Sequence, residues 1–285
     1  MSRMLFAKIN FNGEIYNIYD NEKLFSELIT EMALKINSDD IIIDDEKNVK
    51  FSSIIKENIN GDEIIKGRIV AFYAGSEISY DLKEDRIVAK PNPTKAQYST
   101  FYFNVDKQLI GFVPVAGFSE KQFIHRLELL IKECSGIDVI IILETDIALL
   151  RHKLTKLIEP KKIHAKIIPP NGDKDLFEEL LDIESQELKE TNVKQIDISL
   201  SSRKQVLNIG TSLINKFIKA AELGYALFSA EGKDIEGQPY KIKSNEDALF
   251  EKQLSSDSRD SIPDVEYLAK EGINELLIQK SERNR

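Results

Sequence analysis

The stretch from Gln97 to Leu143 constrains the fold of this chain more than any other part of the sequence. Its first half alternates apolar and polar residues, which predicts a strand over 98–105. Asp106-Lys107 then provides a two-residue turn, and the apolar residues of 109–115 predict a returning strand. A β-hairpin is therefore expected at the centre of the fold.

A helix and a third strand are expected directly after this hairpin. Ser119 is a favourable N-cap residue, and Gly136 is suited to ending a helix. Between them, apolar residues recur at helical spacing, at Phe123, Leu127, Leu130, Ile131 and Cys134. The following run Val139–Leu143 is apolar on both faces, which predicts a strand in the middle of a sheet that is covered on both sides.

The N-terminal part supplies the elements that complete a βαββαβ order. Residues 4–11 alternate as a strand, and 21–36 carry apolar residues at helical spacing. Residues 39–92 contain short β-rich pieces and are interpreted as a meander inserted after this helix. Pro91-Asn92-Pro93 is expected to interrupt the chain, because proline cannot continue a ladder. The sequence thus predicts an α+β fold whose first domain, 1–145, has a ferredoxin-like core.

The remainder of the chain is divided by composition. Residues 146–244 alternate amphipathic helices with short strands, which predicts a second α/β domain. Residues 245–261 are polar and rich in serine, and are interpreted as a mobile linker. A last helix is expected over 263–280, interrupted by Gly272, so that 245–285 form a linker with a C-terminal helix.

The amino-acid composition limits which class of protein this chain can belong to. The chain has 285 residues, 42% of them hydrophobic, with a formal net charge of −9. No apolar run approaches the roughly 20 residues that a membrane-spanning helix needs. The N-terminal residues lack the pattern of a signal peptide, so a cytoplasmic location without membrane association is expected. The acidic balance argues against bulk, non-specific binding of nucleic acid but leaves room for a local basic strip.

The recognised catalytic motifs are absent from the sequence. It contains no phosphate-binding glycine loop, no GxSxG, no HExxH and no CxxC. With three histidines and one cysteine, a cysteine-rich zinc site cannot be assembled. The sequence therefore predicts no cofactor, no metal and no catalytic residues.

The most suggestive local feature is a basic strip within sixteen residues. Alternation places Lys162, His164 and Lys166 on a single face of one strand, where they could follow a phosphate backbone. Alternatively, the strip balances the acidic helix expected over 173–190. The residues expected to bind nucleic acid are Arg151, Lys153, Lys156, Lys161, Lys162, His164 and Lys166.

Two further places have residue types that suit other functions. A metal-dependent nuclease needs acids and a lysine, and Glu231, Lys233, Asp234 and Glu236 provide them, although a glycine-bounded hairpin tip is the simpler interpretation. The last helix could dock on a protein partner through one apolar face. The residues expected on that face are Val265, Leu268, Leu276 and Leu277.

Several segments resemble an uncharacterised bacterial family catalogued as a domain of unknown function. They are Leu223-Gly224-Tyr225, Ala230–Gly237, Gly67-Arg68-Ile69, Phe101-Tyr102-Phe103 and the helix from Ser119. The resemblance covers most of residues 1–250. It implies a gene that lies among mobile-element and phage-defence loci. The paired layout is also similar to the repeat-associated RNA-binding proteins of CRISPR systems, although their glycine-rich loop is absent.

Three classes of function follow from these observations. The first is a component of a bacterial defence or mobile-element system that binds single-stranded nucleic acid, such as RNA, or a protein. The second is a metal-dependent nuclease. The third is a structural adaptor that docks through its C-terminal helix. We expect the first class.

Overall fold

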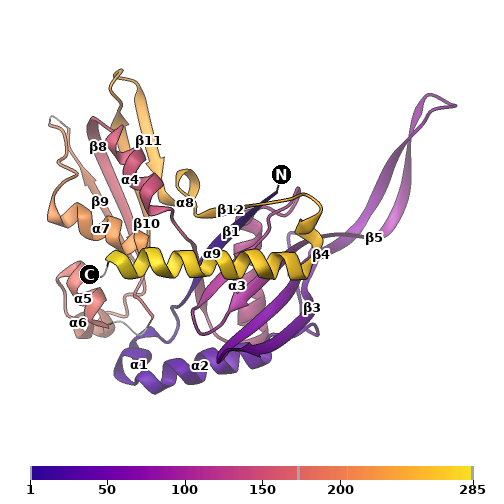
Figure 1. Ribbon diagram of the computed structural model, residues 1–285, viewed down its shortest axis with the longest axis horizontal. Coiled ribbons are helices and arrows are strands. Elements are labelled where there is room, and N and C mark those ends of the chain that lie inside the picture. Colours follow the sequence, from indigo (N-terminus) through magenta and orange to yellow (C-terminus); the bar gives the residue numbers. More distant parts are fainter. Residues whose placement is uncertain (1, 172–173, 204, 284–285) are drawn as a thin grey trace.

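Two antiparallel sheets organise the protein, for which a computed structural model describes residues 2–171, 174–203 and 205–283. Figure 1 shows the two sheets as separate groups of strands, with one long helix that lies across the first sheet and extends toward the second. In the first sheet the strands follow the order β12-β1-β6-β5-β4-β3-β2, and β7 also pairs with β1. Its strands are β1 (Ser2–Phe11), β2 (Ile41–Asp44), β3 (Lys47–Ile59), β4 (Asp62–Asp81), β5 (Arg86–Asn104), β6 (Leu109–Phe112), β7 (Val139–Leu143) and β12 (Glu251–Leu254).

The first sheet contains the βαββαβ core. Its elements come in the order β1, α2 (Glu22–Lys35), β5, β6, α3 (Glu120–Ser135) and β7, after a short helix α1 (Ile15–Asp20). In space the four strands lie in the order β7-β1-β6-β5, and every pair is antiparallel. The predicted α+β fold with a ferredoxin-like arrangement is therefore confirmed.

The prediction for β7 is wrong in one respect. Val139–Leu143 does form a strand with covered faces, but it pairs with β1 alone and so lies at an edge of the sheet. The free edge is partly capped, because the Glu128 carboxylate of α3 accepts a hydrogen bond from the Ile141 backbone N–H at 2.7 Å. An apolar strand can sit at an edge when side chains cover its unpaired backbone groups.

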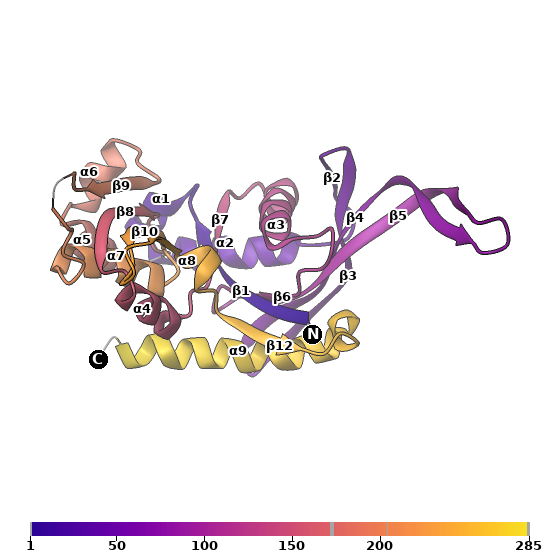
Figure 2. The same ribbon diagram turned by 90° about the horizontal axis from the view of Figure 1, so that it is seen from above.

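Helices cover both faces of the first sheet, as Figure 2 shows. On one face α2 and α3 pack over a core rich in phenylalanine, where the Phe112 and Phe123 rings stack with centroids 3.9 Å apart. α3 begins at a capping box between Ser119 and Gln122 and ends at Gly136, which has a φ of 75°. Both ends of α3 confirm the sequence prediction.

The opposite face is covered by α9 (Ile262–Arg283), which continues without a break through Gly272. A β-carbon at Gly272 would lie 2.1 Å from Cζ of Phe6 on β1. The glycine therefore lets the helix approach the sheet closely, and the predicted interruption is wrong because packing outweighs intrinsic propensity here.

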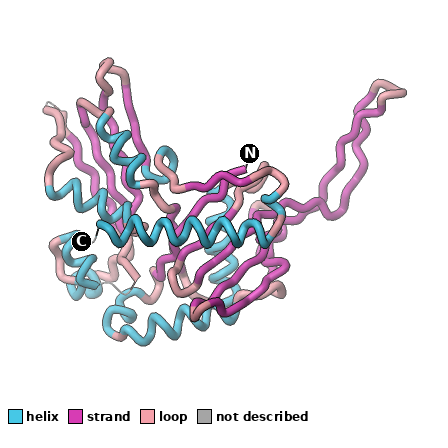
Figure 3. The backbone as a smooth tube through the Cα atoms, in the orientation of Figure 1, coloured by secondary structure: helices cyan, strands magenta, loops and turns pink. Residues whose placement is uncertain are grey.

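The β-rich insertion extends the first sheet as a meander through β2, β3 and β4, as expected. β5 starts earlier than predicted and runs through Pro91-Asn92-Pro93, with Pro91 opposite Ser76. The expected interruption is wrong because β4 and β5 form a two-stranded ribbon here, where each strand has a free edge that tolerates proline. Figure 3 shows this ribbon projecting away from the rest of the molecule.

The second sheet has the strand order β11-β10-β8-β9. Its strands are β8 (Glu159–Ile167), β9 (Ile196–Ser201), β10 (Ala226–Lys233) and β11 (Pro239–Lys243). One face packs on helices around Ile163, Ala165, Phe217 and Phe228. The helices on this face are α1, α4 (Ile147–Thr155), α5 (Lys174–Leu181), α6 (Ser185–Glu190) and α7 (Ser212–Glu222).

The segment 245–261, interpreted as a linker, has a regular structure, so that prediction is wrong. It contains most of α8 (Ser244–Asp247), β12 and a 3-10 turn over Ser258–Asp260. β12 pairs with β1, and Phe250 and Leu254 are buried beside α9. This polar segment has a regular structure because its few apolar residues are buried in the core between α9 and the first sheet.

Candidate functional site

The face of the second sheet opposite its helices presents a regular array of charged and polar side chains. Pairing along the sheet puts Lys162 opposite Glu231, His164 opposite Ser229 and Lys166 opposite Leu227. Residues directly opposite each other in an antiparallel sheet share a face, so the array continues across all four strands. We call this surface the open face: Lys162, His164, Lys166, Asp197, Ser199, Ser201, Leu227, Ser229, Glu231, Lys241 and Lys243.

The open face carries more positive than negative charge. Its lysines are Lys162, Lys166, Lys241 and Lys243, and its acids are Asp197 and Glu231. Glu246 lines the hollow over this face and binds Lys243 at 2.8 Å. The acids are engaged: Glu231 pairs with Lys241, and Asp197 lies 3.2 Å from Nε2 of His164. A hydrogen bond from Lys241 holds the pKa of Glu231 below its usual range, so this acid stays ionised. Among the residues that the structure describes, Lys162 and Lys166 have no carboxylate partner at ion-pair distance.

Residue 173 lies outside the described residues, and the rest of the acidic segment expected over 173–190, which forms α5 and α6, does not balance these charges. Phe177 and Leu180 of α5 pack with Ile163 and Ala165, which lie on the helix-covered side of β8. Since successive side chains of a strand point to opposite faces, α5 lies across the sheet from Lys162 and Lys166. The alternative interpretation, in which the strip faces the acidic helix, is therefore wrong.

The predicted basic strip is divided by the structure. Arg151 and Lys153 belong to α4 on the helix-covered side, where Arg151 binds Glu222 at 2.7 Å and Lys153 donates to the Asp247 carbonyl at 2.5 Å. Lys156 follows the end of α4. Lys161 lies where the pairing of β8 with β10 shifts its register. Together with Lys162 and Lys241 it lines a separate hollow. Of the seven predicted residues, only Lys162, His164 and Lys166 form the array itself.

A groove runs along the open face and past β7. One hollow, of about 400 Å³, lies over the basic array and is bordered by Lys162, His164, Lys241 and Lys243. A second, of about 290 Å³, lies between α3, the free edge of β7 and the end of β8. Both hollows are lined by Lys166, Leu227 and Asn245. The two hollows therefore adjoin at these three residues, and we call them together the groove, which the sequence did not reveal because its residues come from distant segments.

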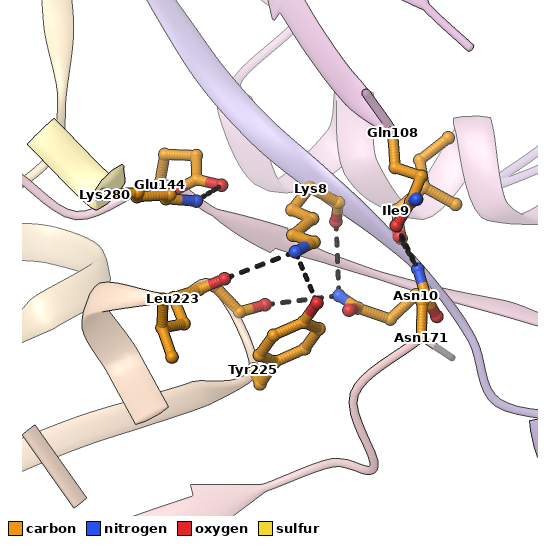
Figure 4. Close-up of polar contacts among 10 residues, drawn as sticks. Lys8, Ile9, Asn10, Gln108, Glu144, Asn171, Leu223, Tyr225 and Lys280 are labelled. Carbon is orange, nitrogen blue, oxygen red and sulfur yellow. Dashed lines mark hydrogen bonds and ion pairs between the residues drawn. The ribbon is translucent and has the colours of Figure 1, made fainter. Parts of the chain in front are cut away.

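A second polar cluster lies where the two sheets meet (Figure 4). Lys8 on β1 donates to the Tyr225 hydroxyl at 2.6 Å, and Asn10 donates to the Gly224 carbonyl at 3.3 Å. Lys280 of α9 binds the fully buried Glu144 at 2.6 Å. Burial lowers the pKa of Lys280, even though Glu144 acts in the opposite direction.

This cluster joins the sheets rather than opening a site. Asn171 adds a further link, because its amide donates to the Ile9 carbonyl and its oxygen accepts from the Phe11 N–H, both at 2.7 Å. The neighbouring hollow of about 540 Å³ is lined by Arg151, Lys219 and Lys280, and each of these cations is paired with a carboxylate. The arrangement fixes the orientation of the two sheets.

In the hairpin that carries Glu231, Lys233, Asp234 and Glu236, two of the acids, Glu231 and Asp234, make local contacts. The Asp234 carboxylate accepts hydrogen bonds from the backbone N–H groups of Glu236 and Gln238, both at 2.9 Å. Within the described ranges, no group of three or more His, Cys, Asp or Glu side chains is arranged to hold a metal ion.

The face of α9 that was expected to bind a partner packs on the chain itself. Val265 and Leu276 are buried against Met4, Phe6 and the neighbouring strands, and Leu268 and Leu277 lie at the border of that core. The prediction of a free docking face on this helix is therefore corrected, because the first sheet has an apolar face of its own that needs cover.

None of the helices in the described parts of the chain is long and apolar enough to span a membrane. Comparison with curated proteins finds no match to this sequence. Comparison with protein-family models finds one that matches residues 4–270, which includes both sheets, the open face and the first part of α9. The chain therefore belongs to the family described as a domain of unknown function, DUF4747.

Proposed function

We propose that this protein binds single-stranded nucleic acid, such as RNA, through the open face of its second sheet. The observation that carries the proposal is the array itself: Lys162, His164 and Lys166 follow one another along β8, and Lys241 and Lys243 lie on the same face of β11, on the other side of β10. Side chains two residues apart on a strand are about 6.6 Å apart, so Lys162, His164 and Lys166 form a regular line of basic side chains. Basic grooves of this kind follow the phosphate backbone of single strands.

The overall charge of −9 limits the strength of this binding. A polyanion is repelled by the molecule as a whole and is attracted only where positive charge gathers locally. Lys241 and Lys243 are paired with Glu231 and Glu246, which leaves Lys162 and Lys166 to contact phosphates. If each of these two lysines contacts one phosphate, the plot of log affinity against log salt has a slope of about −1.4 for a single strand. We therefore expect binding at low salt that weakens as salt is added.

A double charge reversal tests the proposal. Lys162→Glu with Lys166→Glu should abolish binding of a fluorescent single-stranded oligonucleotide in an anisotropy titration at low salt. The matched control is Lys23→Glu with Lys132→Glu, which changes the net charge equally at exposed positions on α2 and α3. The control should bind within a few-fold of the unmodified protein.

Equal binding by both double variants would contradict the proposal, as would a failure of the unmodified protein to bind at low salt. Incubating the protein with the same oligonucleotide and Mg²⁺ or Mn²⁺ distinguishes binding from cleavage. Shortened products would favour a metal-dependent nuclease instead. A setting in bacterial defence or mobile-element biology is part of the proposal. It is supported by the sequence resemblance alone.

A further inference from the structure

The groove changes character along its length. Over the basic array its walls are charged, whereas between α3 and β8 aliphatic side chains form most of the lining, alongside Glu120, Lys121 and His125 of α3. Ile140 and Ile142 of β7 form one wall here, Ile124 of α3 forms another, and Leu227 lies where this hollow meets the one over the open face. A groove that held only a phosphate backbone would have no use for this apolar part, because phosphates are bound by charge and hydrogen bonds.

Polar groups converge at the apolar part from two sides. Glu128 reaches over the edge of β7, and Asn245 lies where the two hollows join. Glu128 offers carboxylate oxygens as hydrogen-bond acceptors, one of which already accepts from the Ile141 N–H, and burial raises the pKa of this carboxyl. An asparagine amide offers both a donor and an acceptor. The planar edge of a nucleobase presents donors and acceptors side by side and is read by groups of this kind.

Lys166 connects this part of the groove to the basic array, because it lines both hollows. A phosphate held by Lys166 would therefore place its own nucleotide at the entrance to the aliphatic hollow. The hollow of about 290 Å³ lies just below the range of about 300–1,000 Å³ found for small-molecule pockets, so it suits one base rather than a longer ligand. Flipped bases are held elsewhere by apolar side chains in the same manner.

We propose that the hollow between α3, the free edge of β7 and Leu227 receives one unpaired nucleobase of the strand whose phosphates lie on the open face. This inference rests on the proposed function and makes it more specific: the ligand must contain a base that can leave its stack. Ile124, Ile140 and Leu227 cover the base, and Glu128 with Asn245 contacts its edge.

The test compares two single-stranded oligonucleotides of equal length and charge. One, the normal strand, carries its bases, and the other, the abasic strand, has the same sugar-phosphate backbone without bases. Binding of each is measured by fluorescence anisotropy at a fixed low salt concentration. The normal strand should bind about tenfold more tightly, which is the effect of burying a single base. Leu227→Thr should bring the affinity for the normal strand down to that for the abasic strand without changing the latter. Thr suits a strand position, and Leu213→Thr, at an exposed site on α7, is the control.

Cross-linking of the unmodified protein provides a second measurement that does not depend on a variant. A photoreactive base in the strand should cross-link to the segment 120–128 or to 140–143, as identified by mass spectrometry. Equal affinity for normal and abasic strands would overturn the base pocket and leave the phosphate-binding proposal standing. Cross-links confined to the β4–β5 ribbon would also overturn it. Absence of binding by either strand would overturn the proposed function itself.

Discussion

Gly272 shows how the effect of a single residue depends on a distant neighbour. In the middle of a helix, glycine is less favourable than alanine by about 1 kcal/mol. Here it faces the Phe6 ring, whose Cζ lies 2.1 Å from the position of an added β-carbon. Carbon atoms in contact lie about 3.5–4.0 Å apart, so an added methyl group would force the ring or the helix to move.

We predict that Gly272→Ala lowers the free energy of unfolding by about 1–3 kcal/mol, the usual cost of overpacking a core. Chemical denaturation followed by circular dichroism measures the change. The control, Asn274→Ala at an exposed position of the same helix, should change stability by no more than about 0.5 kcal/mol. A stabilised Gly272→Ala variant would show that α9 does not pack closely on β1.

Other single residues were predicted from the sequence because their roles are local. Ser119 caps α3 and Gly136 ends it, and both roles depend on residues within four positions along the chain. Gly272 could not be interpreted in this way, since its contact lies on β1, at the other end of the sequence. Its role is visible only when α9 and β1 are seen together.

At the scale of elements, α9 is attached to the first sheet by an ionic contact as well as by its apolar face. Glu266 of α9 binds Lys66 of β4 at 2.7 Å, and the Lys66 side chain is only 9% exposed. Burial alone would raise the pKa of Glu266, but hydrogen bonds from Lys270 and Lys66 hold it below its ordinary value of 4.5. The folded state therefore favours the ionised carboxylate.

The stability that this carboxylate contributes depends on pH. Because its pKa is lower in the folded than in the unfolded state, the contribution is complete above pH 4.5 and is lost as the pH falls through the folded pKa. We predict that Glu266→Gln lowers the free energy of unfolding by about 1–3 kcal/mol at pH 7, the effect of losing a hydrogen bond to a charged group. The difference from the unmodified protein should shrink below pH 4.5.

Urea denaturation at pH 7 and below pH 4.5 measures both effects. Glu271→Gln provides the control, since Glu271 lies on the same helix with its side chain 54% exposed. It should differ from the unmodified protein by less than about 0.5 kcal/mol at either pH. A Glu266→Gln difference that stays constant with pH would contradict the assigned role of this ion pair.

At the scale of the whole molecule, the two ends of the chain come together. β12 pairs with β1, and α9 packs across Met4 and Phe6, although these elements are about 250 residues apart. In the other direction, Ile15 and Tyr16 from the N-terminal part are buried in the core of the second sheet. The hydrophobic core of each sheet therefore contains residues from distant parts of the sequence.

We predict that a chain ending at Lys243 does not form the native fold. It would lack β12 and α9 and would expose the apolar face of β1 with Met4 and Phe6, which are fully buried in the complete protein. Burying a large apolar side chain contributes about 1.5–3 kcal/mol to the free energy of unfolding. The shortened chain loses five such side chains, and their summed contribution is as large as the total stability of a typical protein, about 5–15 kcal/mol. They are Phe250, Leu254, Val265, Ile273 and Leu276.

Size-exclusion chromatography and thermal unfolding test this prediction. The shortened chain should aggregate or unfold without a cooperative transition, whereas a chain ending at Ser281, which retains the apolar residues of α9, should melt like the complete protein. A cooperative transition at the same temperature in the chain ending at Lys243 would show that the C-terminal elements are dispensable, as the predicted linker implied.

The sequence by itself determined the elements and their order: the central hairpin, α3 with its two caps, and the alternation of apolar residues on β8 that separates Ile163 and Ala165 from Lys162 and Lys166. These features depend on periods of two and 3.6 residues and on nearby capping groups, all of which are local. Only the tertiary structure decided that β7 lies at an edge, that α9 covers β1, and that Lys241 and Lys243 complete a basic face. Such outcomes depend on which apolar faces meet across long separations in sequence, and no local pattern specifies that choice.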